Sequence, residues 1–507
     1  MPSFIGAIDQ GTTSSRFLIF DKSGVVIASH QLEFPQYFPN VGWVEQNPNE
    51  ILQSVTHAVE KTVAKFEAKG HSVADIKAIG ITNQRETAVA WDRKTGQPLC
   101  NAIVWNDTRT KDVVHALADS HPSKDVNCIR DICGLPLTTY FTGVKLRWML
   151  ENVPAVKEAQ DEGRLMVGTV DSWLIYNLTG GATNGGIHVT DVTNASRTML
   201  MNIRDLKWSD ELCSFFQVSR EALPKIASSS EVYGHVADGP LKGVPIAGCL
   251  GDQQAATVGQ KCFSPGEAKN TYGTGCFMIF NTGHELTFSD NGLLSTVAYQ
   301  LGPDTKPVYA LEGSIAVAGS AIKWLRDNMG LIQEAADIGR YASEVSNTGG
   351  VYFVTAFSGL FAPYWRDDAR GCLIGLTQYA NRNHICRATL EAICFQTRAI
   401  LDAMNADSKQ SLSVLKVDGG VTNSDVCMQL QADILGIEVV RPANIETTAL
   451  GAAFAAGLAV KEWDSIDDII GSQGDENVVF KPSVDANDRD GRYAKWNEAI
   501  KRSYGWA

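Results

Sequence analysis

The stretch IGAIDQGTTSSRFLIFD, residues 5–21, carries an acidic residue, a glycine and four successive hydroxyl residues between two apolar runs. The runs at residues 4–8 and 17–20 have the composition of short buried strands, and the polar segment between them has that of a turn. Gly11 lets the backbone approach a ligand closely, and residues 12–15 offer hydroxyl and amide donors. Donors at this density suit phosphate oxygens, although an ordinary polar hairpin with glycine at its tip accounts for the stretch equally well.

Asp9 stands at the end of the first apolar run. A carboxylate repels phosphate, but it is a good ligand for Mg²⁺, which takes one or two carboxylates together with substrate phosphates. The same turn therefore predicts a magnesium ion beside the phosphate.

The segment NTYGTGCFMIFNTG, residues 270–283, repeats this outline with a Gly/Thr turn, an apolar strand and a turn of small residues. The spacing from the turn glycine to the strand phenylalanine differs by two residues between the copies, so the repeat is weak by itself. A chain of 507 residues also exceeds the usual size of one core, which predicts at least two domains. No linker is obvious, and the repeat places the domains at residues 1–258 and 259–507.

Strand patterns alternate with helical ones, which predicts an α/β fold. Residues 49–69 place one apolar stripe along a helix, formed by Ile51, Leu52, Val55, Val59, Val63 and Phe66. A buried strand is expected at residues 76–82, and the polar residues 83–86 at its end form a candidate site, because ligands of open α/β sheets lie beyond strand ends. Residues 415–436 predict a strand, a double-glycine turn and a helix, which is either an anion or nucleotide site or a tight connection.

Composition narrows the class of protein. The net charge of -13 disfavours a nucleic-acid or anionic-membrane surface, and the longest apolar run is too short to span a bilayer. The 11 cysteines include no C-x-x-C pair, so we expect reduced and mostly buried thiols in a cytoplasmic protein. The P-loop, Rossmann and protein-kinase motifs are absent from the sequence, so a phosphate must be bound in another way.

Two longer segments, YFTGVKLRWMLEN at residues 140–152 and GCLIGLTQYANRNHICRATLE at 371–391, resemble the sequence patterns of the FGGY carbohydrate kinases. These enzymes belong to the superfamily of actin, hexokinase and the seventy-kilodalton heat-shock proteins. The segments ITNQRET, WNDTRT, GDQQAA, NTYGTGCF and VTDVTNASRTML are similar to the members that phosphorylate glycerol, and the resemblance covers nearly the whole chain. It implies an α/β protein of two domains with duplicated ribonuclease-H-like (actin-like ATPase) topology and a cleft between them for ATP and substrate.

The resemblance also implies roles for individual residues. The ATP-binding positions are Thr12, Thr13, Ser14, Arg16, Thr274, Gly319, Gly420 and Ser424. Asp9 and Asp252 are the implied ligands of Mg²⁺. Lys323 stands near the implied adenine pocket, where glutamine is expected in some bacterial relatives, and it is left out of the predicted site.

For glycerol, the matching positions are Arg85, Glu86, Trp105, Tyr140, Asp252, Gln253 and Phe277. Polar side chains among them can donate to and accept from three hydroxyl groups, and the aromatic rings can pack on the C–H face. Taken singly, Arg85 and Glu86 fit a surface pair, Trp105 and Phe277 fit core aromatics, and Asp252 fits a helix N-cap.

The implied reaction is phosphorylation of glycerol by ATP to sn-glycerol 3-phosphate, with Asp252 as general base, in glycerol catabolism and glycerolipid precursor supply. We expect a cytoplasmic homo-oligomer, a dimer or tetramer, without nucleic acid or a transmembrane segment. One alternative is an FGGY kinase for another polyol or a ketose. Another is an ATP-dependent binding protein without kinase activity, because fold does not fix function.

Overall fold

The computed structural model describes residues 3–408, 411–444, 446–471 and 477–507. Contacts divide the chain into two compact units: unit 1 comprises residues 1–263, 296–309 and 446–474, and unit 2 comprises residues 264–295, 310–445 and 475–507. The predicted domain boundary between residues 258 and 259 stays a prediction. The compact units are not two continuous halves of the chain, because the segments 296–309 and 446–474 belong to unit 1.

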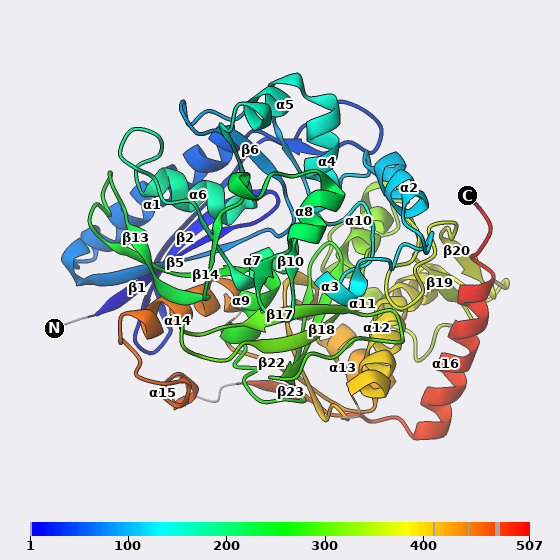
Figure 1. The fold of residues 1–507 in the computed structure, drawn as a ribbon. Helices are drawn as coiled ribbons and strands as arrows, with labels where there is room; N and C mark the ends of the chain where they lie inside the picture. The colour runs from blue at the N-terminus through cyan, green and yellow to red at the C-terminus, as the bar shows by residue number, and fades with distance from the viewer. Residues whose placement is uncertain (1–2, 409–410, 445, 472–476) are drawn as a thin grey trace. The chain divides into compact units, whose positions relative to one another are not determined.

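Unit 1 is built on a six-stranded sheet with the order β13-β14-β5-β1-β2-β3. The strands are β1 (Phe4–Gln10), β2 (Ser14–Asp21), β3 (Val26–Glu33), β5 (Ile76–Asn83), β13 (Ser230–His235) and β14 (Pro245–Gly251) (Figure 1). β1 runs antiparallel to β2 and parallel to β5, β5 runs parallel to β14, and β14 runs antiparallel to β13. The strands predicted at residues 4–8, 17–20 and 76–82 are confirmed.

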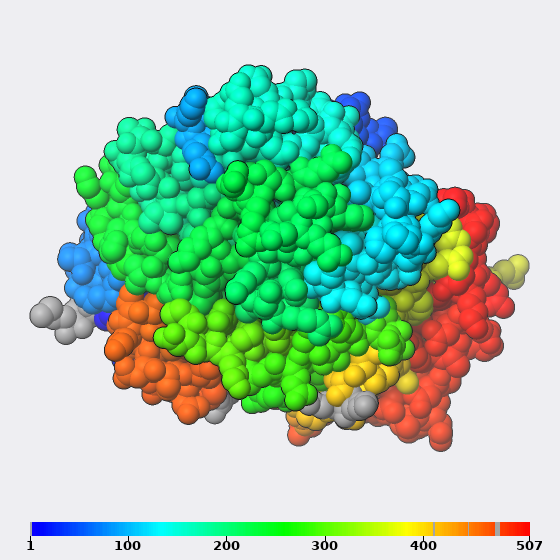
Figure 2. All heavy atoms as spheres, in the orientation of Figure 1, coloured from blue at the N-terminus to red at the C-terminus, as the bar shows by residue number. Residues whose placement is uncertain are grey.

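The helix predicted at residues 49–69 is α1 (Pro48–Ala68), which begins where the Asn47 side chain accepts a hydrogen bond from the amide of Asn49. Its predicted stripe is buried, apart from Leu52, which is half-buried. Helix α14 (Thr447–Ala459) packs against β1, β5 and β14, so the segment of unit 1 nearest the C-terminus reaches its central strands; its residues are orange in Figures 1 and 2. This approach requires glycine at position 80, where a Cβ atom would lie 2.1 Å from the carbonyl oxygen of Ala452.

Shorter elements complete unit 1. The helices are α2 (Lys111–Ser120), α3 (Arg130–Cys133), α4 (Thr142–Asn152), α5 (Pro154–Asp161), α6 (Val170–Leu178), α7 (Val192–Ala195), α8 (Asp210–Phe216), α9 (Asp252–Gly259), α15 (Ile466–Gly471) and the 3-10 turns Val73–Asp75 and Arg220–Ala222. The short strands are β4 (Glu45–Gln46), β6 (Val89–Asp92), β7 (Ala102–Ile103), β8 (Leu165–Gly168), β9 (Val189–Asp191), β10 (Met201–Asn202), β11 (Lys207–Trp208) and β12 (Lys225–Ala227).

The second sheet has seven strands in the order β17-β18-β16-β15-β21-β22-β23. They are β15 (Ala268–Tyr272), β16 (Cys276–Gly283), β17 (Leu294–Tyr299), β18 (Val308–Ile315), β21 (Val414–Asp418), β22 (Glu438–Arg441) and β23 (Val478–Phe480). β15 is antiparallel to β16 and parallel to β21, β21 is parallel to β22, and β22 is antiparallel to β23. The series β16-β15-β21-β22-β23 thus repeats β2-β1-β5-β14-β13 in order and direction, so the weak sequence repeat marks a duplicated fold.

Helices of unit 2 enclose a core centred on α12 (Arg382–Ser408), in which Leu390, Ile393 and Met404 are fully buried. The other elements are α10 (Gly319–Asp327), α11 (Asp337–Ser343), α13 (Asp425–Leu435), α16 (Ala486–Lys501), the 3-10 turn Gly420–Asn423, and the strands β19 (Tyr352–Val354) and β20 (Cys372–Ile374). All 11 cysteines are free and most are buried, as predicted. Among the described residues, no helix combines the length and apolarity needed to cross a membrane.

Candidate active site

The first hairpin joins β1 to β2 and holds a pair of opposite charges. Asp9 and Arg16 face each other in the strand register, and the Arg16 guanidinium donates to the Asp9 carboxylate and, over 2.5 Å, to that of Glu446. The Asp9 carboxylate, together with Glu446, raises the pKa of Arg16. The turn is closed by a hydrogen bond from the Gly11 amide to the Ser14 carbonyl at 2.9 Å. The sequence therefore fixes a permanent cation beside a donor-rich turn.

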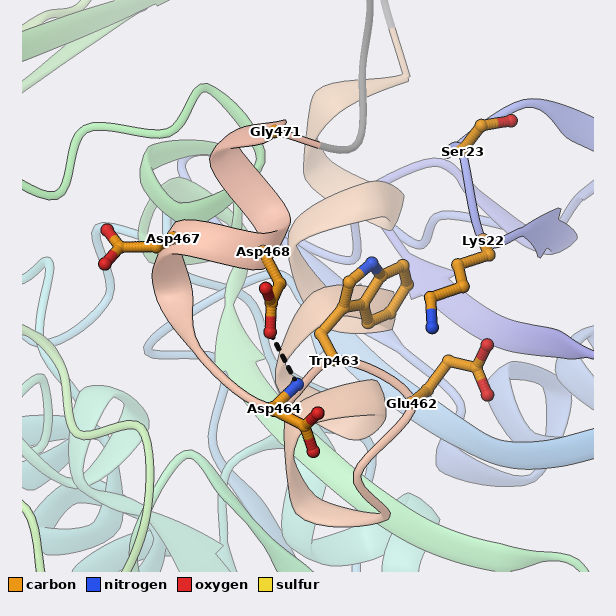
Figure 3. Close-up of a pocket in the computed structure, with 8 residues that line it drawn as sticks. All are labelled: Lys22, Ser23, Glu462, Trp463, Asp464, Asp467, Asp468 and Gly471. Carbon is orange, nitrogen blue, oxygen red and sulfur yellow. Dashed lines mark hydrogen bonds between the residues drawn. The ribbon is translucent and has the colours of Figure 1, made fainter.

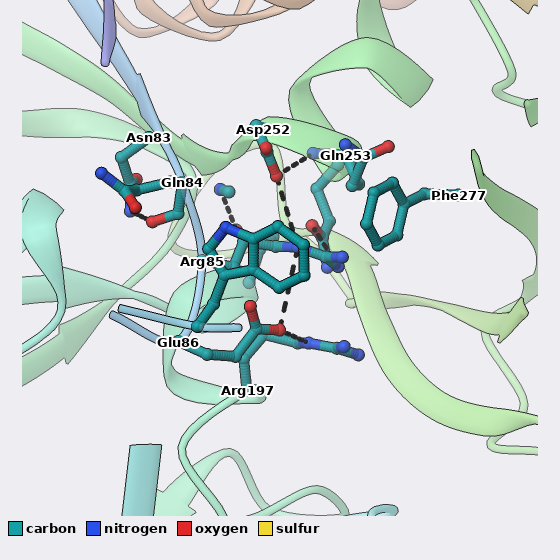
Figure 4. Close-up of polar contacts among 12 residues, drawn as sticks. Asn83, Gln84, Arg85, Glu86, Arg197, Asp252, Gln253 and Phe277 are labelled. Atoms are coloured by element: carbon teal, nitrogen blue, oxygen red, sulfur yellow. Dashed lines mark hydrogen bonds and ion pairs between the residues drawn. The ribbon is translucent and has the colours of Figure 1, made fainter. Parts of the chain in front are cut away.

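A second cluster lies beyond the ends of β5 and β14 (Figure 4). Arg85 Nε lies 3.3 Å from Asp252 Oδ1 and 3.9 Å from Glu86 Oε1. The side chains of Arg85 and Glu86 are 2% and 1% exposed, so the interpretation of this pair as a surface ion pair is wrong. Asp252 remains 30% exposed at its side chain, which leaves its carboxylate open to a ligand.

Aromatic rings adjoin this cluster within unit 1. Tyr140 accepts a hydrogen bond from Arg85 Nη2 at 3.5 Å, and its ring meets that of Trp105 edge-to-face at 5.6 Å. Trp105 Nε1 in turn donates to Thr12 Oγ1 at 3.0 Å. Trp105 thus contacts both the first hairpin and the Arg85 cluster, and it is half-buried rather than a core aromatic.

The backbone at Glu86 has a φ of 60°, in the left-handed region that non-glycine residues seldom adopt. Such strain persists only where surrounding contacts enforce it, and it concentrates at functional sites. Here Arg197 Nε binds Glu86 Oε1 at 2.6 Å, and Thr142 Oγ1 donates to the Glu86 carbonyl at 3.1 Å. These contacts hold the Glu86 carboxylate in a fixed orientation.

Asp252 is the first residue of α9, with Gly251 in the N-cap position. The carboxylate accepts from the adjacent Gln253 amide at 2.8 Å, and the prediction that Asp252 is itself the N-cap is wrong. Gln253 is 6% exposed. The helix start therefore aims the carboxylate toward Arg85, where it makes an ion pair.

Unit 2 contains a cavity of about 740 Å³ that unites four of the predicted nucleotide-binding positions. They are Thr274, Gly319, Gly420 and Ser424, and Lys323 lines the same cavity. Close packing requires glycine at position 319 in the cavity wall, where a Cβ would lie 2.5 Å from the Gly273 carbonyl oxygen. It also requires glycine at position 275, next to Thr274, where a Cβ would lie 2.3 Å from the Ile315 carbonyl oxygen. The cavity has the size of a small-molecule site.

Another cavity, of about 600 Å³, lies in unit 1 beside α15 (Figure 3). Its lining includes Glu462, Asp464, Asp467 and Asp468 together with Lys22. Asp468 is engaged in capping α15, because its carboxylate accepts from the Asp464 and Ser465 amides at 3.1 Å. This acidic surface would repel phosphates, so it is a poor candidate for ATP.

The other predicted site residues, Thr13, Ser14 and Phe277, lie outside the Arg85 cluster and the cavity of unit 2. Thr13 is exposed and Ser14 is half-buried, and Ser14 Oγ accepts from Gln31 Nε2 at 3.0 Å. Phe277 lies on β16 of unit 2, opposite Thr271, while the other predicted glycerol contacts belong to unit 1.

Two residues of the cluster escaped prediction: Arg197, and Gln254, whose Oε1 accepts from Arg85 Nη1 at 3.3 Å. The available signal for Arg197 was its place in the segment VTDVTNASRTML, which resembles the family.

Two family models match the sequence of this chain. The model of the FGGY family of carbohydrate kinases, N-terminal domain, matches residues 4–259, and that of the C-terminal domain matches residues 268–460. The chain belongs to the FGGY family of carbohydrate kinases. The resemblance, the two-domain α/β fold and the expectation of an enzyme are thereby confirmed for this FGGY kinase.

Relatives match this FGGY kinase along its whole length. A protein of Leifsonia xyli subsp. xyli named glycerol kinase is 54% identical over 507 residues, covering 100% of this chain and 98% of that protein. A probable glycerol kinase of Dictyostelium discoideum is 50% identical, covering 100% of this chain and 99% of its own. The crystal structure of Plasmodium falciparum glycerol kinase with ADP superposes with a TM-score of 0.90 at 39% identity, covering 99% of this chain and 98% of that one.

Proposed function

We propose that this FGGY kinase transfers the γ-phosphate of ATP to a terminal hydroxyl of glycerol and forms sn-glycerol 3-phosphate. The observation that carries the proposal is the buried pair Arg85 and Glu86 with the partly exposed Asp252, beside the rings of Trp105 and Tyr140. The full-length relatives named glycerol kinase support it.

Glycerol needs hydrogen-bond partners for three hydroxyl groups and an apolar surface for its carbon chain. In the proposed site, Arg85 and Gln253 donate, and Glu86 and Asp252 accept. The ion pair with Arg197 orients the Glu86 carboxylate, so this acceptor is in place before the substrate arrives. The ring faces of Trp105 and Tyr140, and Phe277 from unit 2, are assigned to the carbon chain.

Asp252 is the proposed general base. Its carboxylate is reachable from solvent, and it would accept the proton of the attacking hydroxyl as the oxygen–phosphorus bond forms and the bond to the ADP oxygen breaks. Arg16 and the amide groups of the first hairpin would neutralise charge on the transferred phosphoryl group. Thr12, Thr13 and Ser14 are assigned to the same phosphate, and Thr274, Gly319, Gly420 and Ser424 to the nucleotide.

The residues fit a magnesium ion. Asp9 lies on β1 and Asp252 follows β14, and these strands flank β5 in one sheet with parallel pairing, so both carboxylates emerge at the same sheet edge. Mg²⁺ favours one or two carboxylates plus phosphate oxygens. When bound, it would supply positive charge to the phosphates of ATP. We further assign the enzyme to the cytoplasm, as a homo-oligomer serving glycerol catabolism and glycerolipid supply.

The first test is the initial rate of ADP release from Mg-ATP with glycerol, dihydroxyacetone, erythritol, xylitol, ribulose and xylulose, with identification of the product. Preference for glycerol with sn-glycerol 3-phosphate formed supports the proposal. Preference for a longer polyol or a ketose would assign the enzyme to another substrate, and hydrolysis independent of all of them would favour an ATP-dependent binding protein.

The second test is Asp252→Asn, which we expect to lower kcat by about 100- to 10,000-fold while glycerol affinity changes only a few-fold. Asp210→Asn is the matched control, because Asp210 is the first residue of α8 in the same unit and pairs only at the surface with Arg220 at 2.6 Å. Normal turnover of Asp252→Asn would remove the residue from this role.

A further inference from the structure

Asp191, the last residue of β9, is a fully buried carboxylate outside the proposed substrate site. It accepts five hydrogen bonds: from the amide and hydroxyl of Thr193 at 3.0 and 2.9 Å, from the amide and Nδ2 of Asn194 at 2.9 and 2.9 Å, and from Ser229 Oγ at 2.8 Å. Every partner is a donor, which requires the ionised carboxylate. Burial raises the pKa of Asp191 to about 6, while the hydrogen bonds from Asn194, Thr193 and Ser229 favour the ionised form.

The partners of Asp191 extend to both strands that end at the proposed site. Asn194 exchanges hydrogen bonds with Asn83, from Asn83 Nδ2 to Asn194 Oδ1 at 3.0 Å and from Asn194 Nδ2 to Asn83 Oδ1 at 3.1 Å. Asn83 ends β5 and stands two residues before Arg85. Thr193 Oγ1 accepts from the Gly251 amide at 2.9 Å, and Gly251 immediately precedes Asp252.

We propose that Asp191 is a positioning residue: through Asn194 it fixes Arg85, and through Thr193 it fixes Asp252. We call the series Asp191–Asn194–Asn83 and Asp191–Thr193–Gly251 the two arms of this network. Both arms start from the Asp191 carboxylate, so this one group sets the spacing between Arg85 and Asp252. Arg197, on the same segment, adds a third link through its ion pair with Glu86. The inference rests on the proposed function, because its readout is the kinetics of phosphorylation.

Asp171 offers a matched control. Its carboxylate is equally buried, and it accepts from Thr169 Oγ1 at 2.5 Å, from Thr190 Oγ1 at 2.6 Å and from Cys249 Sγ at 3.8 Å. Burial also raises its pKa. None of these three donors belongs to Asn194, Thr193, Asn83 or Gly251. The hydrogen bonds of Asn83 with Asn194 and of the Gly251 amide with Thr193 do not involve Asp171, so Asp171→Asn removes a buried charge without breaking them.

The experiment compares Asp191→Asn with Asp171→Asn in steady-state assays varying glycerol and ATP separately. In Asp191→Asn an amide must face five donors, the arms lose their anchor, and kcat/KM for glycerol falls about 100-fold while KM for ATP stays within about twofold. Asp171→Asn stays within about threefold of the parent. Equal losses in the two variants would overturn the inference, since burial of a charge would then be the whole effect.

Variants of Thr193 test one arm alone, and they serve as the test if Asp191→Asn does not fold. Thr193→Val keeps the shape but removes the hydroxyl that binds Asp191 and Gly251, so we expect kcat to fall about tenfold or more with KM for glycerol changed less than threefold. Thr193→Ser restores the hydroxyl and recovers kcat. A valine variant as active as the serine variant would overturn the inference.

Failure of the proposed function has a different signature. It would appear as absence of glycerol phosphorylation by the unmodified enzyme, whereas failure of the inference leaves that activity intact and the Thr193 variants alike. If the substrate panel identifies another polyol or ketose, the same variants are assayed with that substrate, and the contrast between Asp191 and Asp171 decides the inference.

Discussion

The hairpins β1–β2 and β15–β16 occupy the same place in the series of five strands that the two sheets share, yet they carry different chemistry. The second residue pair from the turn is Asp9 opposite Arg16 in the first hairpin, and Thr271 opposite Phe277 in the second hairpin. The two hairpins therefore share their strand pairing. At this residue pair, charged side chains are present in the first hairpin and absent from the second.

The turn glycines differ as well. A Cβ at Gly11 would meet its nearest neighbour, the Ser14 carbonyl oxygen, at 3.4 Å, which is an ordinary contact. A Cβ at Gly275 would clash with the Ile315 carbonyl oxygen at 2.3 Å. The first turn therefore has free space beside Gly11 and a charged pair, Asp9 and Arg16, next to it. The second turn packs closely against the backbone of β18 at Gly275. We infer that the first hairpin supplies charge to the reaction and the second supplies shape to the nucleotide cavity.

Loss of the charge in the first hairpin should have the largest effect. Arg16→Gln should lower kcat by about 100- to 1,000-fold, because a preorganised cation would no longer stabilise charge on the transferred phosphoryl group. The measurement is kcat for glycerol phosphorylation at saturating ATP, together with the melting temperature.

Glu446→Gln is the control for this variant. It removes the 2.5 Å ion pair of Arg16 but keeps the guanidinium and its contact with Asp9, so kcat should change by less than about threefold. A loss in Glu446→Gln as large as in Arg16→Gln would show that the ion pair acts structurally, and the contrast between the hairpins would lose its chemical meaning.

Loss of the fit in the second hairpin should have an intermediate effect. Gly275→Ala should lower the free energy of unfolding by about 1–3 kcal/mol, because carbonyl groups of β18 and the residue after it cannot yield to the new methyl group. Gly11→Ala should stay within about 0.5 kcal/mol, since its site is open and its φ is not positive. Urea unfolding of both variants measures the difference, and equal stabilities would erase the distinction between an open and a closely packed turn.

Local patterns were sufficient to predict much of this fold. The strands of the first hairpin, helix α1 and β5 follow from apolar periodicity, and the duplicated outline followed from a Gly/Thr turn that occurs twice. Periodicity is local, so it survives without tertiary information. The grouping of Thr274, Gly319, Gly420 and Ser424 around one cavity came from family resemblance, because no local signal joins positions so far apart.

Other features arise only in the folded chain. The left-handed backbone of Glu86 is imposed by partners such as Arg197, 111 residues away, and residue-by-residue preferences disfavour it. Burial of Arg85 could not be read from its neighbours, since a charged residue is normally exposed. The return of residues 446–474 to unit 1 depends on glycine contacts such as that of Gly80 with Ala452, which have no signature in sequence order.

The smallest expected effect concerns Lys323, an exposed cation lining the proposed nucleotide cavity of unit 2. If the second hairpin serves shape, cations near it act only at long range, so Lys323→Gln should raise KM for ATP about two- to fivefold at low ionic strength. The effect should vanish at about 0.5 M salt, where a charge in water is screened within a few ångströms. Lys207→Gln, which removes an exposed lysine of unit 1, is the control and should leave KM for ATP unchanged. A loss in Lys323→Gln that exceeds tenfold or persists in salt would mean that unit 2 binds the nucleotide through charge as well, and the division of roles between the hairpins would fail.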